Sequence, residues 1–411
     1  MKRYCYFFLI LFVSLAAQAQ TISDSLFHYD RASLCVMMIS RPEQLFNREI
    51  EIIFKEMNMP ERFNDHSLGP RVITSSAKGK NVVSQLQLFA QKNEVAKKMV
   101  AKWFHRDRKT GSCDVDLLLE RGLYNARVDA LEIAQQTVRG KAILEDAGEK
   151  LIKNTYLVVC DYTYKTQYNL AQKNTTQKDD RLENARLIDA SNQQEVDWYN
   201  DQLYAMDSKL SRFTLICHSY LFRLDWNEEV ANLFYNNHYT PKSNIDPKKV
   251  AAFNDDHSSY RLTFVAEAEN SYSTRNSDKL SNQQLIKKAC IRLLDNNLAT
   301  LQHLYADFRI KSPVVTTQPL KAYIGMKEDV NPDALYEVLL PEYKENGTYT
   351  YQQIGIVQPI EGEIWDNRYM LSEEQPDEEL PDSRKEPGTL FRQVSGSDIL
   401  SGMLLREMVQ N

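Results

Sequence analysis

The chain has 411 residues, of which 43% are hydrophobic and 26% are charged, and its formal net charge is −6. These values describe an ordinary globular protein. Glycine is scarce: 13 of the 411 residues are glycine, well under the average of roughly 7%. Because neither G-x-G-x-x-G nor G-x-x-x-x-G-K occurs, the sequence argues against phosphate-cradling loops, and we expect no cofactor.

The amino terminus has the features of a secretory signal peptide. Lys2 and Arg3 precede an apolar run from Tyr4 to Leu15, and the small residues Ala17 and Ala19 follow. This order predicts a signal peptide over residues 1–19, cleavage after Ala19 and export to the periplasm or the medium. A short buried strand or an uncleaved anchor is the alternative. No later segment is apolar enough to span a bilayer, so we expect no transmembrane span in the mature chain.

A helix-rich first domain is predicted over residues 20–152. One buried strand, Ser33–Ile39, begins it. The expected helices are Pro42–Met57, Val82–Trp103, Asp114–Arg121, Tyr124–Arg139 and Ala142–Ile152.

An α+β domain is predicted over residues 153–310, because β-branched and aromatic residues become frequent after Asn154. The expected strands are Thr155–Tyr164, Ser211–Trp226 and Ser259–Ser273, and the expected helices are Asn227–Tyr235 and Ser281–Tyr305. Ser281 and Gln284 form a capping-box pattern at the start of the last helix. A long polar segment, Gln167–Glu195, is interpreted as a surface excursion.

Short strand-like runs separated by turn residues predict a small β-barrel domain over residues 311–411. Its one long insertion, the acidic segment 372–388, is expected to be a loop. The predicted fold class is therefore α+β, with a mostly helical N-terminal part, a layered middle domain and a small C-terminal β-barrel.

Five cysteines remain after signal removal, and four lie in apolar contexts that favour buried thiols over disulfides. Cys113, in a polar run, is predicted to be the exposed one. In an extended strand Cys160 and Asp161 point to opposite faces, so they do not form one catalytic pair. We expect Cys160 to be a core residue and assign no catalytic residues.

The segment Lys92–Lys109 contains seven basic residues and two acidic ones. Its end places aromatic and basic side chains together and gives the candidate binding residues: Trp103, Phe104, Arg106, Arg108 and Lys109. In an exported protein nucleic acid is not expected, so the partner would be an anionic envelope surface, such as a phosphate-bearing lipid head group, or an acidic envelope protein. The alternative is a helix whose last turn carries basic residues, with Trp103 in the core.

Seven histidines show no zinc-ligand spacing, and we expect no metal site. The segments Asn64–His66 and Asp255–His257 would form a metal site only if the fold brought them together. No G-x-S-x-G elbow is present. A secreted or periplasmic hydrolase without a recognisable motif is kept as the alternative function.

Three stretches carry a resemblance to a family: EDAGEKLIKNTYLVVCDY (145–162), KAYIGMKEDVNPDALYEVLL (321–340) and GTLFRQVSGSDILSGMLLRE (388–407). They resemble uncharacterised exported proteins of Gram-negative bacteria. The order of the predicted domains is similar to that of envelope accessory proteins such as the flagellar assembly protein T group and the lipoprotein activators of cell-wall synthases. The resemblance implies a cell-envelope binding or scaffolding protein without catalysis.

Overall fold

The computed structural model describes residues 32–44, 46–60, 62–69, 71–74, 79–125, 150–166, 213–273, 281–343, 349–368 and 387–408. Several predictions fall outside these residues: the signal peptide 1–19, nearly all of the helix Tyr124–Arg139, most of the helix Ala142–Ile152, the segment Gln167–Glu195 and nearly all of the loop 372–388.

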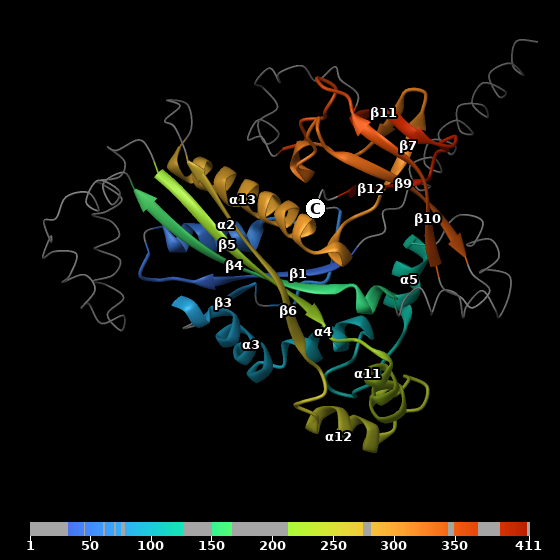
Figure 1. Cartoon of the computed structure of the whole chain (residues 1–411). Coiled ribbons are helices and arrows are strands. Elements are labelled where there is room, and N and C mark those ends of the chain that lie inside the picture. Colours follow the sequence, from blue (N-terminus) through green and yellow to red (C-terminus); the bar gives the residue numbers. More distant parts are fainter. Residues whose placement is uncertain are drawn as a thin grey trace, which may run out of the picture.

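A mixed sheet of six strands forms the first unit (Figure 1). Its order is β2-β1-β4-β5-β6, and β3 also pairs with β1. The β1 strand runs parallel to β2, β3 and β4, whereas the neighbours β4–β5 and β5–β6 are antiparallel. The strands are β1 (Ser33–Ser40), β2 (Asn64–Asp65), β3 (Val72–Thr74), β4 (Thr155–Thr166), β5 (Phe213–Leu224) and β6 (Leu262–Ser273).

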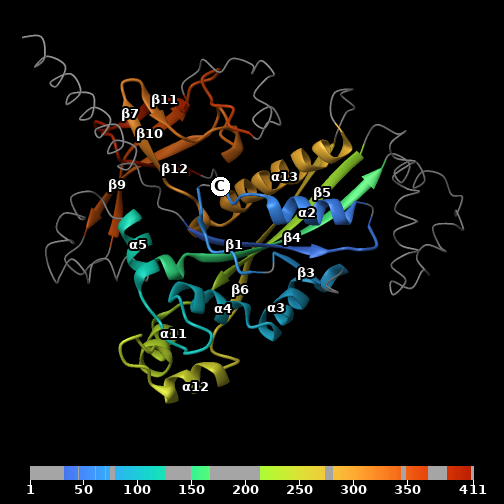
Figure 2. The ribbon, with the colours of Figure 1, turned by 180° about the vertical axis from the view of Figure 1, so that it is seen from behind.

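Helices cover both faces of this sheet. The helices α2 (Asn47–Glu56) and α13 (Asn282–Leu304) pack on one face, and the others lie on the opposite face, as the two opposed views show (Figures 1 and 2). The helices on the opposite face are α3 (Val82–Lys92), α4 (Val95–Trp103), α5 (Asp116–Asn125), α11 (Glu228–Leu233), the π-turn η2 (Phe234–His238) and α12 (Pro247–Asp255). The 3-10 turn η1 (Gly79–Asn81) precedes α3, and η3 (Ala306–Phe308) follows α13.

The two sides of β4 follow the predicted alternation. Tyr156, Val158 and Cys160 belong to the core under α2 and α13. Leu157 and Val159 belong to the core on the other face. The predicted division of this strand into two faces is confirmed, and Cys160 has no exposed surface.

Short strands form the C-terminal unit. They pair antiparallel in the order β10-β11-β8-β7-β12-β9, and β9 returns to β10. The strands are β7 (Ser312–Thr317), β8 (Leu320–Ala322), β9 (Leu335–Tyr343), β10 (Tyr349–Pro359), β11 (Thr389–Gly396) and β12 (Leu404–Met408), with the 3-10 turn η4 (Met326–Glu328) between β8 and β9. The links β7–β12 and β8–β11 comprise only two residue pairs each.

The predicted fold class is wrong, and the chain is a mixed α/β protein. The first strand does not belong to a separate helical part, because β1 pairs with β4 over seven residue pairs, from Ser33–Thr155 to Ile39–Asp161. The C-terminal strands close into a ring, in which the links β7–β12 and β8–β11 are short. The residue limits of the three predicted domains stay a prediction.

Candidate functional site

The two aromatic residues of the predicted binding segment lie in the core. Trp103 and Phe104 have no exposed surface. The indole of Trp103 donates to the Thr155 hydroxyl at 3.1 Å, and its ring lies 4.5 Å from the Arg121 guanidinium carbon. Phe104 packs against Phe234, with ring centroids 4.2 Å apart. Neither side chain reaches a partner at the surface.

Arg106 fastens the turn that follows α4. Its guanidinium lies 4.1 Å from the centre of the Phe253 ring and donates to the carbonyls of Gly111 and Val250. Gly111 has a φ of +74°, and a Cβ there would lie 2.7 Å from the Val250 side chain. A side chain at position 111 would therefore push the turn away from α12.

Asp107 fixes the conformation of the same turn. Its Oδ1 accepts hydrogen bonds from the backbone N–H groups of Lys109 and Thr110 and from the Thr110 hydroxyl. These bonds lower the pKa of Asp107. The carboxylate is thereby occupied with the backbone of its own turn.

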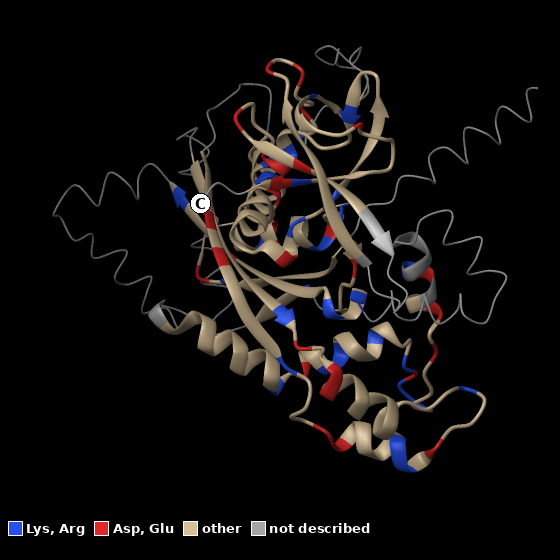
Figure 3. Ribbon diagram, turned by 45° about the vertical axis from the view of Figure 1, so that its right-hand side comes forward, with Lys and Arg blue, Asp and Glu red and all other residues tan. Residues whose placement is uncertain are grey.

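Arg108 and Lys109 project from this turn into solvent. The described part of the chain offers neither of them a carboxylate within ion-pair distance, whereas nearby Lys242 is bound to Asp114 at 2.7 Å. Acidic and basic residues both occur over this end of the ribbon (Figure 3). Among the described residues, Arg108 and Lys109 can therefore bind an external anion, whereas Lys242 is already paired with Asp114. We call residues 105–112, which carry Arg108 and Lys109, the basic turn.

Cys113, predicted to be exposed, is buried, so that prediction is wrong. The cause is tertiary: its backbone N–H donates to the Thr240 carbonyl at 2.7 Å, and the segment before α12 covers it. All five cysteines in the described residues are free thiols.

A buried charge cluster joins the two units. Arg62, from the loop before β2, lies 2.9 Å from Glu328 of η4 and 3.8 Å from Asp295 of α13. Lys327 lies 3.9 Å from the same Asp295 carboxylate. Burial raises the pKa of Asp295, while Arg62 and Lys327 act in the opposite direction. Sequence reasoning missed this cluster, because its members are far apart in the chain and have no distinctive spacing.

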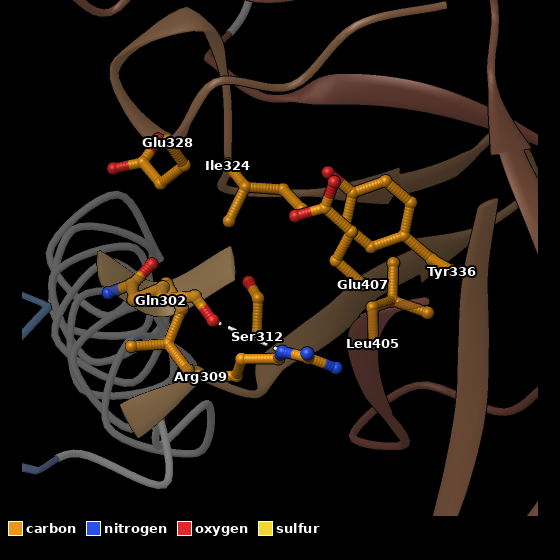
Figure 4. Close-up of a pocket in the computed structure, with 9 residues that line it drawn as sticks. Gln302, Arg309, Ser312, Ile324, Glu328, Tyr336, Leu405 and Glu407 are labelled. Carbon is orange, nitrogen blue, oxygen red and sulfur yellow. Dashed lines mark hydrogen bonds between the residues drawn. The ribbon is translucent and has the colours of Figure 1, made fainter. Parts of the chain in front are cut away.

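A small cavity lies beside this cluster, between the end of α13 and the C-terminal strands (Figure 4). Gln302, Arg309, Glu328, Tyr336 and Glu407 contribute the larger polar side chains of its wall. Its volume is about 30 Å³, which is room for a water molecule and far below the roughly 300 Å³ of a small ligand pocket. Its size suits a single water molecule better than a small-molecule ligand.

The buried Ser312 supports that reading. Its hydroxyl has no hydrogen-bond partner in the described protein, and its side chain lines the cavity. A water molecule in this space would satisfy it. Arg309 closes the wall by donating to the carbonyls of Gln302 and His303.

A second contact between the units lies at the end of α13. His303 Nε2 is 2.9 Å from Glu407 of β12. The nearby Glu407 carboxylate raises the pKa of His303. Burial and Arg309 oppose this shift, whereas Asp329 adds to it.

The two histidine strings singled out in the sequence have different partners. His66 is fully buried: its Nε2 is 2.9 Å from the Met99 carbonyl and its Nδ1 is 3.2 Å from Arg121. Burial, with Arg121 next, lowers the pKa of His66 to about 3, so it is neutral. His257 instead contacts Glu94. The described residues include no group of three His, Cys, Asp or Glu placed to hold a metal ion.

No known protein family matches this chain, and the search of curated proteins also found no match. Among the helices that the structure describes, none has the length and apolar character needed to cross a membrane.

Proposed function

We propose that this protein is an exported, non-catalytic binding protein of the cell envelope, and that its basic turn docks on an acidic surface of another envelope protein. Export is supported by the charged, apolar and small residues of positions 1–19. The resemblance to envelope scaffolds supports the same class. The exported hydrolase stays the alternative prediction.

The rigidity of the basic turn is the observation that carries this proposal. Arg106 holds the turn against Phe253 and Val250, and Asp107 holds its backbone. Arg108 and Lys109 are therefore presented on backbone that is already ordered. Binding through a preorganised turn avoids much of the entropy that a mobile loop would lose.

The burial of the aromatic residues favours an acidic protein over a lipid surface. Peripheral membrane sites usually insert Trp or Phe into the head-group region beside the cations. Here Trp103 and Phe104 are committed to the core. The basic turn thus supplies charge without an apolar anchor, which suits an acidic protein surface in water.

A charge reversal tests the proposal. The full-length mature protein is titrated with a fluorescent Glu-rich peptide and, separately, with vesicles containing phosphatidylglycerol. We expect the peptide to bind. Arg108→Glu/Lys109→Glu should weaken binding at least about tenfold, since two exposed pairs of about 0.2–1 kcal/mol each turn from attraction to repulsion. Binding should also weaken as salt is added.

The matched control is Arg48→Glu/Lys153→Glu, which makes the same charge change at two exposed positions elsewhere. It should bind the peptide as the unaltered protein does. Equal loss in both variants would show that only net charge matters and would overturn the site. Binding to vesicles but not to the peptide would replace the protein partner with a lipid head group.

A further inference from the structure

The outer strand of the sheet is unusually long for an edge. β6 comprises 12 residues and is the last strand in the sheet order, with β5 as its one partner among the described strands. Strands usually have about five or six residues, and edge strands tend to be shorter still because their free N–H and C=O groups can pair with another chain. With respect to the described residues, this edge therefore presents a long row of backbone donors and acceptors.

The two faces of β6 differ in chemistry. Ala266 and Ala268 point into the core and are buried, and α13 packs on that face. On the other face the side chains of Glu267 and Glu269 are 50% and 62% exposed. Ser271 continues this exposed row.

Among the described residues, Glu267 and Glu269 have one imidazole and no Lys or Arg within ion-pair distance. His218 on β5 lies 3.4 Å from Glu267 and 3.6 Å from Glu269, so one imidazole serves two carboxylates. Asp161 on β4 stands opposite His218 in the register but is already bound by Arg41 at 2.6 Å. Within the described part of the chain, Glu267 and Glu269 thus place negative charge next to the β6 edge.

We infer that the β6 edge is a second docking site, which takes an extended, cationic segment of a partner protein as an added strand. Residues two apart on a strand lie about 6.6–6.8 Å from each other on one face. Lys or Arg at alternate positions of the partner would therefore face Glu267 and Glu269, while the backbones pair.

A second copy of this chain does not fit the same edge. Antiparallel pairing of β6 with itself about Ala268 would place Glu267 of each copy opposite Glu269 of the other. Like charges directly opposite each other destabilise a strand pair. The same carboxylates that attract a cationic segment thus oppose self-association. A scaffold with this site and the basic turn could hold two partners of opposite charge.

The probe is a short fluorescent peptide of alternating Lys and Thr, titrated into the full-length mature protein and followed by anisotropy. A second peptide of the same sequence is N-methylated at alternate residues, which removes backbone donors along one edge but keeps every charge. We expect the first peptide to bind at least tenfold more tightly than the second. Amide hydrogen exchange should slow along β6 when the first peptide is bound.

The protein variants are Glu267→Lys/Glu269→Lys and, as a matched control, Glu56→Lys/Glu120→Lys at two exposed helix positions. The first should lose about tenfold in affinity and the control should keep it. Equal binding of both peptides would overturn strand addition, as would a loss of affinity in both variants. The N-methyl comparison uses the unaltered chain and so does not depend on the variants folding. The Glu-rich peptide test of the basic turn is separate, so either proposal can fail alone.

Discussion

Replacement of Arg62 by Met should destabilise the protein by about 3 kcal/mol. The Arg62 side chain is 4% exposed and contacts both Glu328 and Asp295. Removing one member of a buried ion pair commonly costs about 3–5 kcal/mol, because the remaining charge stays in a poorly solvated place. Glu328 keeps hydrogen bonds from the Gly325 N–H and the Asn367 amide, and Asp295 keeps Lys327. The lower end of the range is therefore expected.

The assay is urea unfolding at neutral pH, with the free energy extrapolated to water. The matched control is Arg406→Met, which removes a pair with Glu337 in which the arginine side chain is 34% exposed and should cost less than about 1 kcal/mol. Adding Asp295→Asn and Glu328→Gln to Arg62→Met should restore part of the stability, since the unpaired charges are then gone. A cost for Arg62→Met no larger than that of Arg406→Met would refute the reasoning.

Three further predictions use other contacts. The His303–Glu407 pair should stabilise the fold fully below the ordinary histidine pKa of about 6.5 and lose its effect as the pH rises through the raised folded-state pKa of His303. Urea unfolding should therefore show a larger difference in unfolding free energy between the unaltered protein and His303→Gln at about pH 5.5 than at about pH 8.5. Cys160 should react slowly with thiol reagents in the folded state, as measured by mass spectrometry, and rapid labelling would contradict its burial. Gly325→Ala should lower the unfolding free energy by at least about 2 kcal/mol because its Cβ would meet the Trp365 carbonyl oxygen, whereas Gly69→Ala, with nothing within 4 Å, should be nearly neutral.

Local patterns in the sequence were predictable where a short-range rule governs them. The alternation along β4 placed Cys160 in the core, and the capping box of Ser281 and Gln284 forms as expected at the start of α13. Such features depend on the period of a strand or the first turn of a helix, both of which lie within a few residues.

Backbone breaks inside a continuous apolar pattern were harder to predict. The expected helix Val82–Trp103 is two helices, because the chain turns at Asn93 and Glu94, and Glu94 adopts a φ of 50°. Lys97 and His257 bind the Glu94 side chain in this position. His257, which follows α12, is far from Glu94 in the sequence, so no local pattern predicts the break between the two helices.

The candidate sites show the same limit. The cationic side chains Arg108 and Lys109 were recognised from their run of charge, but the burial of Trp103 and Phe104 depends on helices and strands that the sequence does not place. The pairing of Arg62 with Glu328 and the position of β6 at the edge follow from strand order. Strand order is decided by contacts between distant segments, which one sequence does not reveal.

The position of β1 inside the sheet has a consequence for synthesis. It is bonded to β4 on one side and to β2 and β3 on the other, although β4 begins only at Thr155. At roughly 5–20 residues per second, the nascent chain carries the apolar segment Ser33–Ser40 without its main partner for on the order of ten seconds. A holding chaperone has that interval in which to bind it, and a truncated chain that stops before Thr155 would be a target for proteases.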